Sequence, residues 1–189
     1  MIICVDFDNI LNNLTEKAVE LYNMRNGANI QLSDITSYNF VDCLHKEDAD
    51  GICALFKDKE LWDSLKPIPG SREALKKLIK NGHKVYIATA TDPINFSWKC
   101  QWLEQYFPFI SSNDVIRIMD KGLLKTDVLI DDHISNLIDN FCDRICLNYP
   151  WNQSASKDFA YCIRRAYNWD DIMSFIYEME RKDVEWQKQ

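Results

Sequence analysis

Two aspartates directly follow the first apolar run of the chain, and they are the first candidates for chemistry. The run 1–5, Met-Ile-Ile-Cys-Val, ends in Asp6-Phe-Asp8. This pattern is typical of a buried strand that delivers its acids to the carboxyl edge of an open α/β sheet, where such sheets bind ligands. The pair alone is equally consistent with a solvated turn or a helix cap. Asp170-Asp171, for example, opens an amphipathic helix whose dipole accounts for both charges.

Further polar groups follow three later segments that are predicted to be strands. Residues 85–88 lead to Thr89, residues 115–119 lead to Asp120-Lys121, and residues 127–130 lead to Asp131-Asp132. Because the carboxyl ends of parallel strands meet at one edge of a sheet, these side chains are expected to lie together. Lys125 is a weaker candidate than Lys121, because about 17 Å of extended chain separates it from the acidic end of its strand.

The predicted group suits phosphoryl transfer. Crowded carboxylates repel one another unless a cation holds them, and oxygen ligands without a histidine or cysteine cluster favour Mg²⁺. A hydroxyl and a lysine would supply a hydrogen-bond donor and a positive charge to phosphoryl oxygens. One aspartate could then act as the nucleophile, forming an aspartyl-phosphate, and a second could act as general acid and base.

The elements that position this group alternate between strands and helices. Apolar residues at helical spacing predict helices over 11–25, after residue 71, through Trp98 and Trp102, and from Trp169 onward, and 144–147 is expected to be a fifth strand. This order predicts a doubly wound, mostly parallel α/β sheet with the first strand central. The stretch 28–65 is aromatic and lacks strand-like alternation. We therefore expect a core of residues 1–13 and 66–189 and a helical insert, or cap, of residues 14–65.

Composition excludes several classes of protein. The 189 residues allow one domain with a small insert, and 47% hydrophobic and 27% charged residues are typical of a globular protein. A net charge of −7 without a basic stripe argues against a nucleic-acid polymer as partner. We see no secretory signal and no membrane-spanning run. The seven scattered cysteines are expected to be reduced thiols, so a cytoplasmic location is predicted.

The motifs resemble a known superfamily. Asp6 and Asp8, Thr89, Lys121 and the acid pair at 131–132 follow the order of the four motifs of the haloacid dehalogenase phosphotransferases. The insert after the first motif resembles that superfamily's first type of cap. Within the superfamily, the chain is most similar to the 5′(3′)-deoxyribonucleotidases almost from end to end. The stretches that carry this similarity are 64–70, 102–107, 120–132 and 168–171.

The resemblance implies roles for the predicted site. Asp6 would be the nucleophile, and Asp8 would protonate the leaving oxygen and later activate water. Thr89 and Lys121 would bind phosphate. Mg²⁺ would be held by Asp6, the backbone carbonyl of Asp8 and the carboxylate of Asp131. The next acid in the chain, Asp132, would contact these ligands without binding the metal itself.

Aromatic residues of the insert are the candidates for substrate binding. Phe40, Phe56 and Trp62 resemble the positions that enclose the base and sugar, although they could equally form the small core of the cap. Several residues beside the motifs depart from the family pattern. Asn9 and Ile10 replace a usual glycine and valine, Ala90 replaces a serine that commonly follows the motif threonine, and His133 replaces a usual arginine. These departures leave the base and sugar preference open.

The function expected from the sequence is Mg²⁺-dependent hydrolysis of nucleoside monophosphates. One alternative keeps the chemistry and changes the substrate to another small phosphomonoester, such as a sugar phosphate. A receiver-type signalling module uses similar residues, but it places the accepting aspartate on the third strand, and it has no cap. A nucleotide-binding relative without turnover is a further alternative, and both a monomer and a homodimer are left open.

Overall fold

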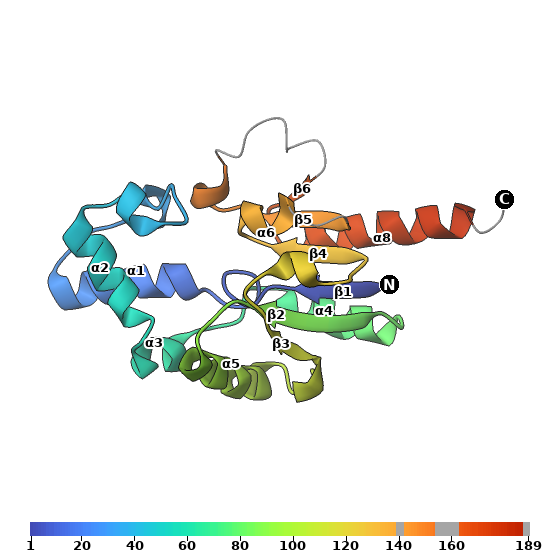
Figure 1. Cartoon of the computed structure of the whole chain (residues 1–189), viewed down its shortest axis with the longest axis horizontal. Coiled ribbons are helices and arrows are strands. Elements are labelled where there is room, and N and C mark those ends of the chain that lie inside the picture. Colours follow the sequence, from blue (N-terminus) through green and yellow to red (C-terminus); the bar gives the residue numbers. More distant parts are fainter. Residues whose placement is uncertain (139–141, 154–162, 187–189) are drawn as a thin grey trace.

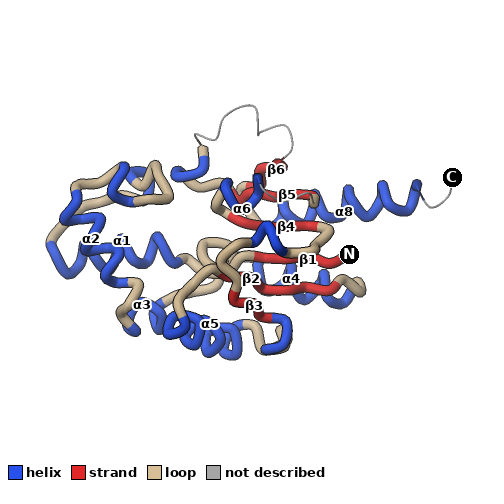
Figure 2. Tube along the Cα trace, viewed as in Figure 1, coloured by secondary structure: helices blue, strands red, loops and turns tan. Residues whose placement is uncertain are grey.

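The strands form one parallel sheet with the acid-bearing strand inside it. The computed structural model describes residues 1–138, 142–153 and 163–186, with side chains described as far as residue 181. The strands are β1 (Ile2–Val5), β2 (Lys84–Thr89), β3 (Val115–Arg117), β4 (Val128–Asp131), β5 (Asp143–Leu147) and β6 (Ile163–Ala166). Their order is β3-β2-β1-β4-β5-β6, and every pair is parallel (Figure 2). The central position expected for the first strand is confirmed.

Helices cover both faces of the sheet, which confirms the doubly wound fold. They are α4 (Ser71–Lys80), α5 (Pro93–Tyr106), α6 (Ile134–Ile138) and α8 (Trp169–Trp186). Alternate residues of β1 point to opposite faces, as in any strand. Ile3 and Val5 belong to a cluster with buried residues of α4, α5 and α8, whereas Cys4 belongs to a second cluster with Leu137 of α6.

A helical segment lies beyond the carboxyl edge of the sheet, at the left of Figure 1. It contains α1 (Leu14–Asn26), α2 (Lys46–Leu55), α3 (Lys59–Ser64) and two short 3₁₀ turns, Leu32–Asp34 and Phe40–Asp42. The chain leaves and re-enters the sheet region side by side, because Asn12 forms an antiparallel bridge with Pro67. The buried cluster is continuous from the sheet into this segment. Division of the chain at residues 13 and 66 stays a prediction.

Three details of the sequence prediction were wrong. The first helix begins at Leu14 rather than at residue 11, because the side-chain oxygen of Asn12 accepts the Leu14 N–H at 2.9 Å and ends the preceding turn. The third strand ends at Arg117 rather than at Met119, because Arg117 pairs with Thr89, the last residue of the neighbouring strand β2. The strand β6 was missed, because its sequence Ile-Arg-Arg-Ala lacks an apolar run. No helix in the described part of the chain is long and apolar enough to cross a membrane.

Candidate active site

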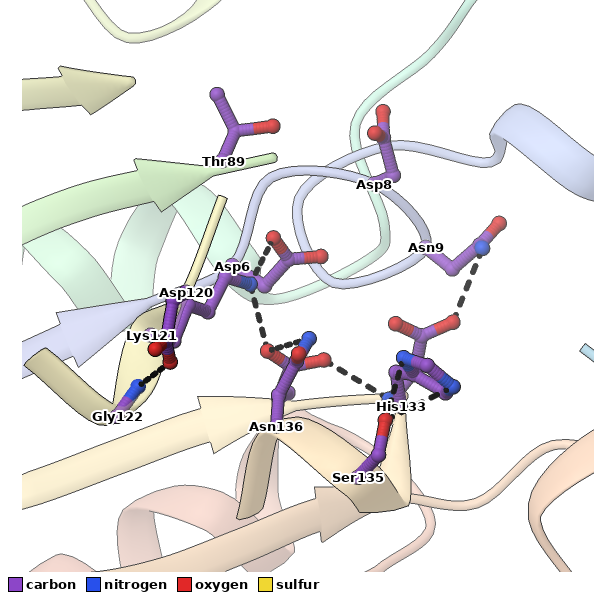
Figure 3. A network of polar contacts seen from close by, with 12 residues as sticks. Asp6, Asp8, Asn9, Thr89, Asp120, Lys121, Gly122, His133, Ser135 and Asn136 are labelled. Atoms are coloured by element: carbon purple, nitrogen blue, oxygen red, sulfur yellow. Dashed lines mark hydrogen bonds and ion pairs between the residues drawn. The ribbon is translucent and has the colours of Figure 1, made fainter. Parts of the chain in front are cut away.

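The carboxyl edge of the sheet gathers the polar residues that the strand ends were expected to deliver (Figure 3). Asp6 follows β1, Thr89 is the last residue of β2 and Asp131 is the last residue of β4. Lys121 opens a 3₁₀ turn, Lys121–Leu123, in the connection from β3 to β4. All four side chains are buried. The predicted grouping of an acid, a hydroxyl and a lysine at one edge therefore exists.

Lys121 joins the first and the last acid of this edge. Its Nζ donates to Oδ1 of Asp6 at 2.5 Å and to Oδ2 of Asp131 at 2.6 Å. Burial lowers the pKa of the Lys121 ammonium, but the two acids outweigh burial and raise that pKa above its ordinary value. The competing candidate, Lys125, is exposed. Lys121 is therefore a fixed positive charge at this edge.

Three carboxylates meet closely enough to share a cation. One oxygen from each of Asp6, Asp131 and Asp132 lies within 4.8 Å of the others. Burial, together with the like charge of Asp6, raises the pKa of Asp131 to about 6, although the charge of Lys121 opposes this rise. Burial and the charges of its acidic neighbours also raise the pKa of Asp132 well above its usual range. One lysine cannot balance three carboxylates, so this set of hard oxygen donors fits Mg²⁺.

The two acids at the end of β4 differ in how many protein donors they already accept. Oδ1 of Asp131 accepts the backbone N–H of His133 at 2.8 Å, and Oδ2 accepts Lys121 and the amide of Asn136 at 3.0 Å. Both oxygens of Asp131 are thus engaged by the protein.

Asp132 keeps one oxygen without a donor from the described residues. Its Oδ2 accepts Nδ2 of Asn9 and Nε1 of Trp151, each at 3.0 Å. Its backbone carbonyl accepts Nδ2 of Asn152 at 2.9 Å. These contacts orient the carboxylate while leaving Oδ1 available. Of the two acids, Asp132 therefore has the greater capacity to accept a further ligand.

Asn9 stands at a position where the family usually has glycine, and its backbone conformation and contacts account for the asparagine. Its φ of 57° lies in the left-handed region, which asparagine tolerates better than other side chains. Its side chain donates to Asp132 and accepts the N–H of Thr15 in α1 at 3.0 Å. Tyr149 also donates to the Asn9 carbonyl at 2.8 Å. Asn9 therefore ties the acid pair to the start of the helical segment, and sequence reasoning did not find this role.

Replacing Asn9 separates the backbone effect from the side-chain effect. Both Asn9→Gly and Asn9→Ala lose the two side-chain hydrogen bonds, but only alanine adds strain at positive φ. We expect both variants to be less stable than the wild type, and Asn9→Ala to be less stable than Asn9→Gly by about 1 kcal/mol. Urea unfolding followed by circular dichroism measures both values. Equal stability of the two variants would contradict the backbone account.

Asp8 points away from the carboxylate cluster toward a lysine that the sequence analysis missed. Oδ2 of Asp8 accepts a hydrogen bond from Nζ of Lys99 on α5, and the same Nζ donates to Oγ1 of Thr89 at 2.7 Å. Burial raises the pKa of Asp8, Lys99 opposes that rise and Asp6 adds to it. One signal for Lys99 was in the sequence, because it lies on the same helical stripe as the buried Trp102.

A cavity of about 400 Å³ is lined by residues from the sheet edge and from the helical segment. Its polar and charged lining residues include Asp8, Asn9, Lys99, Asn95 and Thr91. The aromatic lining residues are Tyr38, Phe40, Phe56, Trp62 and Trp151. The cavity thus combines charged groups with aromatic walls, as a phosphate ester of a flat, apolar group would require.

The aromatic candidates line this cavity, and two of them also belong to the buried core. Phe40 and Trp62 are part of the hydrophobic cluster, whereas Phe56 is half-buried and packs against it. The ring centroids of Phe40 and Phe56 are 6.0 Å apart, and Nε1 of Trp62 donates to the Phe56 carbonyl at 2.9 Å. The packing interpretation and the binding interpretation therefore apply to the same side chains.

The helical segment also touches the acid edge directly. Tyr38 stacks on the ring of His133 with centroids 3.7 Å apart and planes 13° apart. His133 immediately follows the acid pair, so this stack joins the outer wall of the cavity to the end of β4.

Comparison with solved structures identifies the fold. A haloacid dehalogenase-like protein of unknown function from Agrobacterium tumefaciens aligns with a TM-score of 0.62 and 12% identity over 95% of this chain and 98% of that chain. A hydrolase of the same class from Deinococcus radiodurans, solved with phosphate and sodium, aligns with a TM-score of 0.59 and 11% identity over 87% of this chain and 90% of that one. The fold is therefore that of the haloacid dehalogenase-like hydrolases.

Sequence comparison narrows the class to a family. The family described as 5′ nucleotidase, deoxy (Pyrimidine), cytosolic type C protein matches residues 1–183, and the chain belongs to this family. A 5′(3′)-deoxyribonucleotidase of Bacillus subtilis (strain 168) is 28% identical over 172 residues, covering 90% of this chain and 95% of the relative. One from Clostridium acetobutylicum is 29% identical over 153 residues, covering 81% and 84%.

Family membership confirms the resemblance and the class of reaction. The protein is a phosphomonoester hydrolase. This result decides against the receiver-type signalling module. The roles of the individual site residues stay predictions.

Proposed function

We propose that this protein hydrolyses nucleoside monophosphates, deoxyribonucleotides in particular, to nucleoside and phosphate. The observation that carries the proposal is a cavity lined both by Asp8 and Lys99 and by five aromatic side chains. The names of the similar proteins, 5′(3′)-deoxyribonucleotidases, support the same substrate class. A phosphate would face the acids while the base lies among the rings.

In the first step, a carboxylate oxygen of Asp6 attacks the phosphorus. The new oxygen–phosphorus bond forms as the bond to the nucleoside oxygen breaks, and Asp8 gives its proton to that leaving oxygen. The Thr89 hydroxyl and the Lys121 ammonium stabilise the phosphoryl oxygens. The product is a nucleoside and a phosphate ester of Asp6.

In the second step, water attacks the aspartyl-phosphate. Asp8, now ionised, accepts a proton from this water as the bond from phosphorus to Asp6 breaks. Inorganic phosphate leaves, Asp6 is a free carboxylate again and Asp8 has recovered its proton. Both acids therefore end the cycle as they began it.

Mg²⁺ is the cation we propose for the carboxylate cluster. When bound, it would neutralise negative charge on the phosphoryl group as the transition state forms. Asp6 and the backbone carbonyl of Asp8 would contribute ligands, together with one acid at the end of β4. The sequence favoured Asp131 for that place, with Asp132 behind it. The hydrogen bonds favour the reverse, because the protein already engages both oxygens of Asp131.

We further propose that residues 14–65 act as a cap over the substrate. Phe40, Phe56 and Trp62 would enclose the base and sugar. A phosphatase for another small phosphomonoester, such as a sugar phosphate, would share the chemistry but would gain nothing from aromatic walls. The cytoplasmic location and the choice between monomer and homodimer stay predictions.

A substrate panel tests the proposal. Phosphate release is measured from deoxyribonucleoside and ribonucleoside monophosphates with 5′ or 3′ phosphates, from hexose phosphates and from p-nitrophenyl phosphate, each with and without Mg²⁺. We expect nucleotides to have the highest kcat/KM. Equal turnover of nucleotides and hexose phosphates would contradict the nucleotide assignment. Tight nucleotide binding without phosphate release would identify a silent relative instead.

Phe56→Ala tests the role of the aromatic wall. Stacking of a base on an aromatic side chain contributes roughly 1–3 kcal/mol, so we expect KM for a nucleoside monophosphate to rise about tenfold. The KM for a hexose phosphate should change much less, because that ester carries no aromatic ring to stack on Phe56. Tyr167→Ala, which removes an exposed ring outside the cavity, is the matched control. An equal rise for both substrates would make Phe56 a packing residue only.

A further inference from the structure

Lys99 occupies an unusual place for a lysine. It is 1% exposed, and α5 holds it in the lining of the cavity. Its Nζ donates to Oδ2 of Asp8 and to Oγ1 of Thr89. The faces of Phe7 and Trp62 lie beneath the same ammonium, with ring centroids 5.2 and 5.5 Å away. Every side of this charge is therefore in contact with protein or with the cavity.

Stability alone does not account for this arrangement. A buried ion pair gains little over apolar residues of similar volume, because both charges lose their hydration. A methionine or leucine at position 99 could fill the space between the two rings. The buried ammonium is therefore better explained by what it does to its two hydrogen-bond partners.

The contact with Thr89 fixes the direction of the hydroxyl proton. An ammonium group has only donors, so Thr89 must accept the hydrogen bond from Lys99. The one proton of the Thr89 hydroxyl is then directed elsewhere. A phosphoryl oxygen in the cavity is an acceptor for it.

The contact with Lys99 gives the two oxygens of the Asp8 carboxyl group different surroundings. Lys99 engages Oδ2, whereas Oδ1 is shielded from solvent and receives no hydrogen bond from the described residues. A carboxyl group whose Oδ2 is held by an ammonium carries its transferable proton on Oδ1. The ion pair thus leaves one defined oxygen, Oδ1, without a hydrogen bond from the described residues and available to hold the proton.

We propose that Lys99 is a positioning residue that sets Oδ1 of Asp8 and the Thr89 hydroxyl against the same phosphate ester. This inference rests on the proposed phosphatase mechanism, in which Asp8 protonates the leaving oxygen. Loss of Lys99 would leave the nucleophile Asp6 and its partner Lys121 in place. Its main effect would fall on esters whose leaving group needs a proton.

The test compares leaving groups in Lys99→Met. Nucleoside monophosphates and glycerol phosphate release alkoxides, which must be protonated, whereas p-nitrophenyl phosphate releases a stable phenolate. Correctly placed general acids contribute roughly 10²–10⁴-fold to rate. We expect kcat/KM, which reports the first step, to fall about 100-fold for both alkyl esters and less than about tenfold for the aryl ester, because hydrolysis of the aspartyl-phosphate is the same for all three. An equal loss for all three substrates, or no loss, would overturn the inference.

Controls separate this role from a structural one. Lys76→Met removes another lysine that lies over an aromatic ring, Phe109 at 5.3 Å, but on the surface of α4, and it should leave all rates unchanged. Lys99→Gln keeps a neutral donor beside Asp8 and replaces Lys99→Met if the latter does not fold. In an Asp8→Asn background, Lys99→Met should add no further selectivity between leaving groups. Additional selectivity there would contradict action through Asp8.

Glycerol phosphate keeps the two proposals distinguishable. A wild-type enzyme that hydrolyses glycerol phosphate but not nucleotides would contradict the proposed substrate. The leaving-group comparison for Lys99 could still be made with the glycerol and aryl esters, and its result would stand by itself.

Discussion

Asp6→Asn is expected to reduce kcat by more than about 10⁴-fold, because removal of a covalent nucleophile leaves no route to the intermediate. An amide oxygen is a poor nucleophile, but it still accepts the hydrogen bond from Lys121. The substitution also removes one negative charge from the cluster with Asp131 and Asp132. We therefore expect the free energy of unfolding to change by less than about 1 kcal/mol. Phosphate release and urea unfolding measure the two effects.

Asp170→Asn is the matched control for this experiment. It makes the same chemical change in another acid pair, at the exposed start of α8, outside the catalytic cavity. Its activity should equal that of the wild type. If Asp6→Asn retained a few per cent of wild-type turnover, Asp6 would not be the nucleophile. If it lost activity together with stability, a folding defect would replace the chemical explanation.

Removal of Mg²⁺ with a chelator is expected to abolish turnover, and added Mg²⁺ is expected to restore it. Variants of the two acids at the end of β4 should differ in the Mg²⁺ concentration that restores turnover. Asp132→Asn should raise the Mg²⁺ concentration for half-maximal activity by more than about 100-fold. Asp131→Asn should raise it about tenfold, because it disturbs the surroundings of the ligands and not a ligand itself. Isothermal titration with Mg²⁺ measures the same affinities without turnover.

The opposite ranking would restore the assignment that the sequence favoured, with Asp131 as ligand. Turnover that persists in the chelator would contradict Mg²⁺ dependence altogether. Asp114→Asn provides a control, since this acid lies in the 3₁₀ turn before β3 and outside the carboxylate cluster. Its requirement for Mg²⁺ should match that of the wild type.

The residues at strand ends could be predicted from the sequence because short-range patterns determine them. A run of apolar residues that stops at a polar one marks the edge of a buried parallel strand. Asp6, Thr89 and Asp131 each stand at such a point, and the structure places all three at the same edge. Lys121 could be chosen over Lys125 by counting residues along an extended chain.

Residues whose role depends on distant partners could not be predicted in this way. A lysine in a helix is normally solvated, and Lys99 is buried only because Asp8 and Thr89 meet it from two other elements. Asn9 looked like a departure from a glycine pattern until its φ and its bond to Asp132 were known. Helical spacing could place Lys99 on the buried side of its helix, but nothing local identified the partners of either residue.

The missed strand has a similar cause. β6 pairs with β5 at the edge of the sheet, and its central residues are Arg164 and Arg165. Edge strands often carry charge, which discourages pairing with other chains, so they lack the apolar run of a central strand. Nη1 of Arg165 donates to Oδ1 of Asn152 at 2.6 Å. Nδ2 of the same Asn152 donates to the backbone carbonyl of Asp132.

The interior position of β1 also bears on how the polypeptide folds as it is synthesised. Ile2 pairs with Lys84 and Ile3 pairs with Val128. The strand that leads to both acids is therefore synthesised well before the two strands with which it pairs. Helices α1 to α3 form their mutual contacts from neighbouring parts of the chain, which is the faster kind of assembly. During synthesis, the helical segment can therefore fold before the strands that pair with β1 are available. The active site is completed only when β4 joins the sheet.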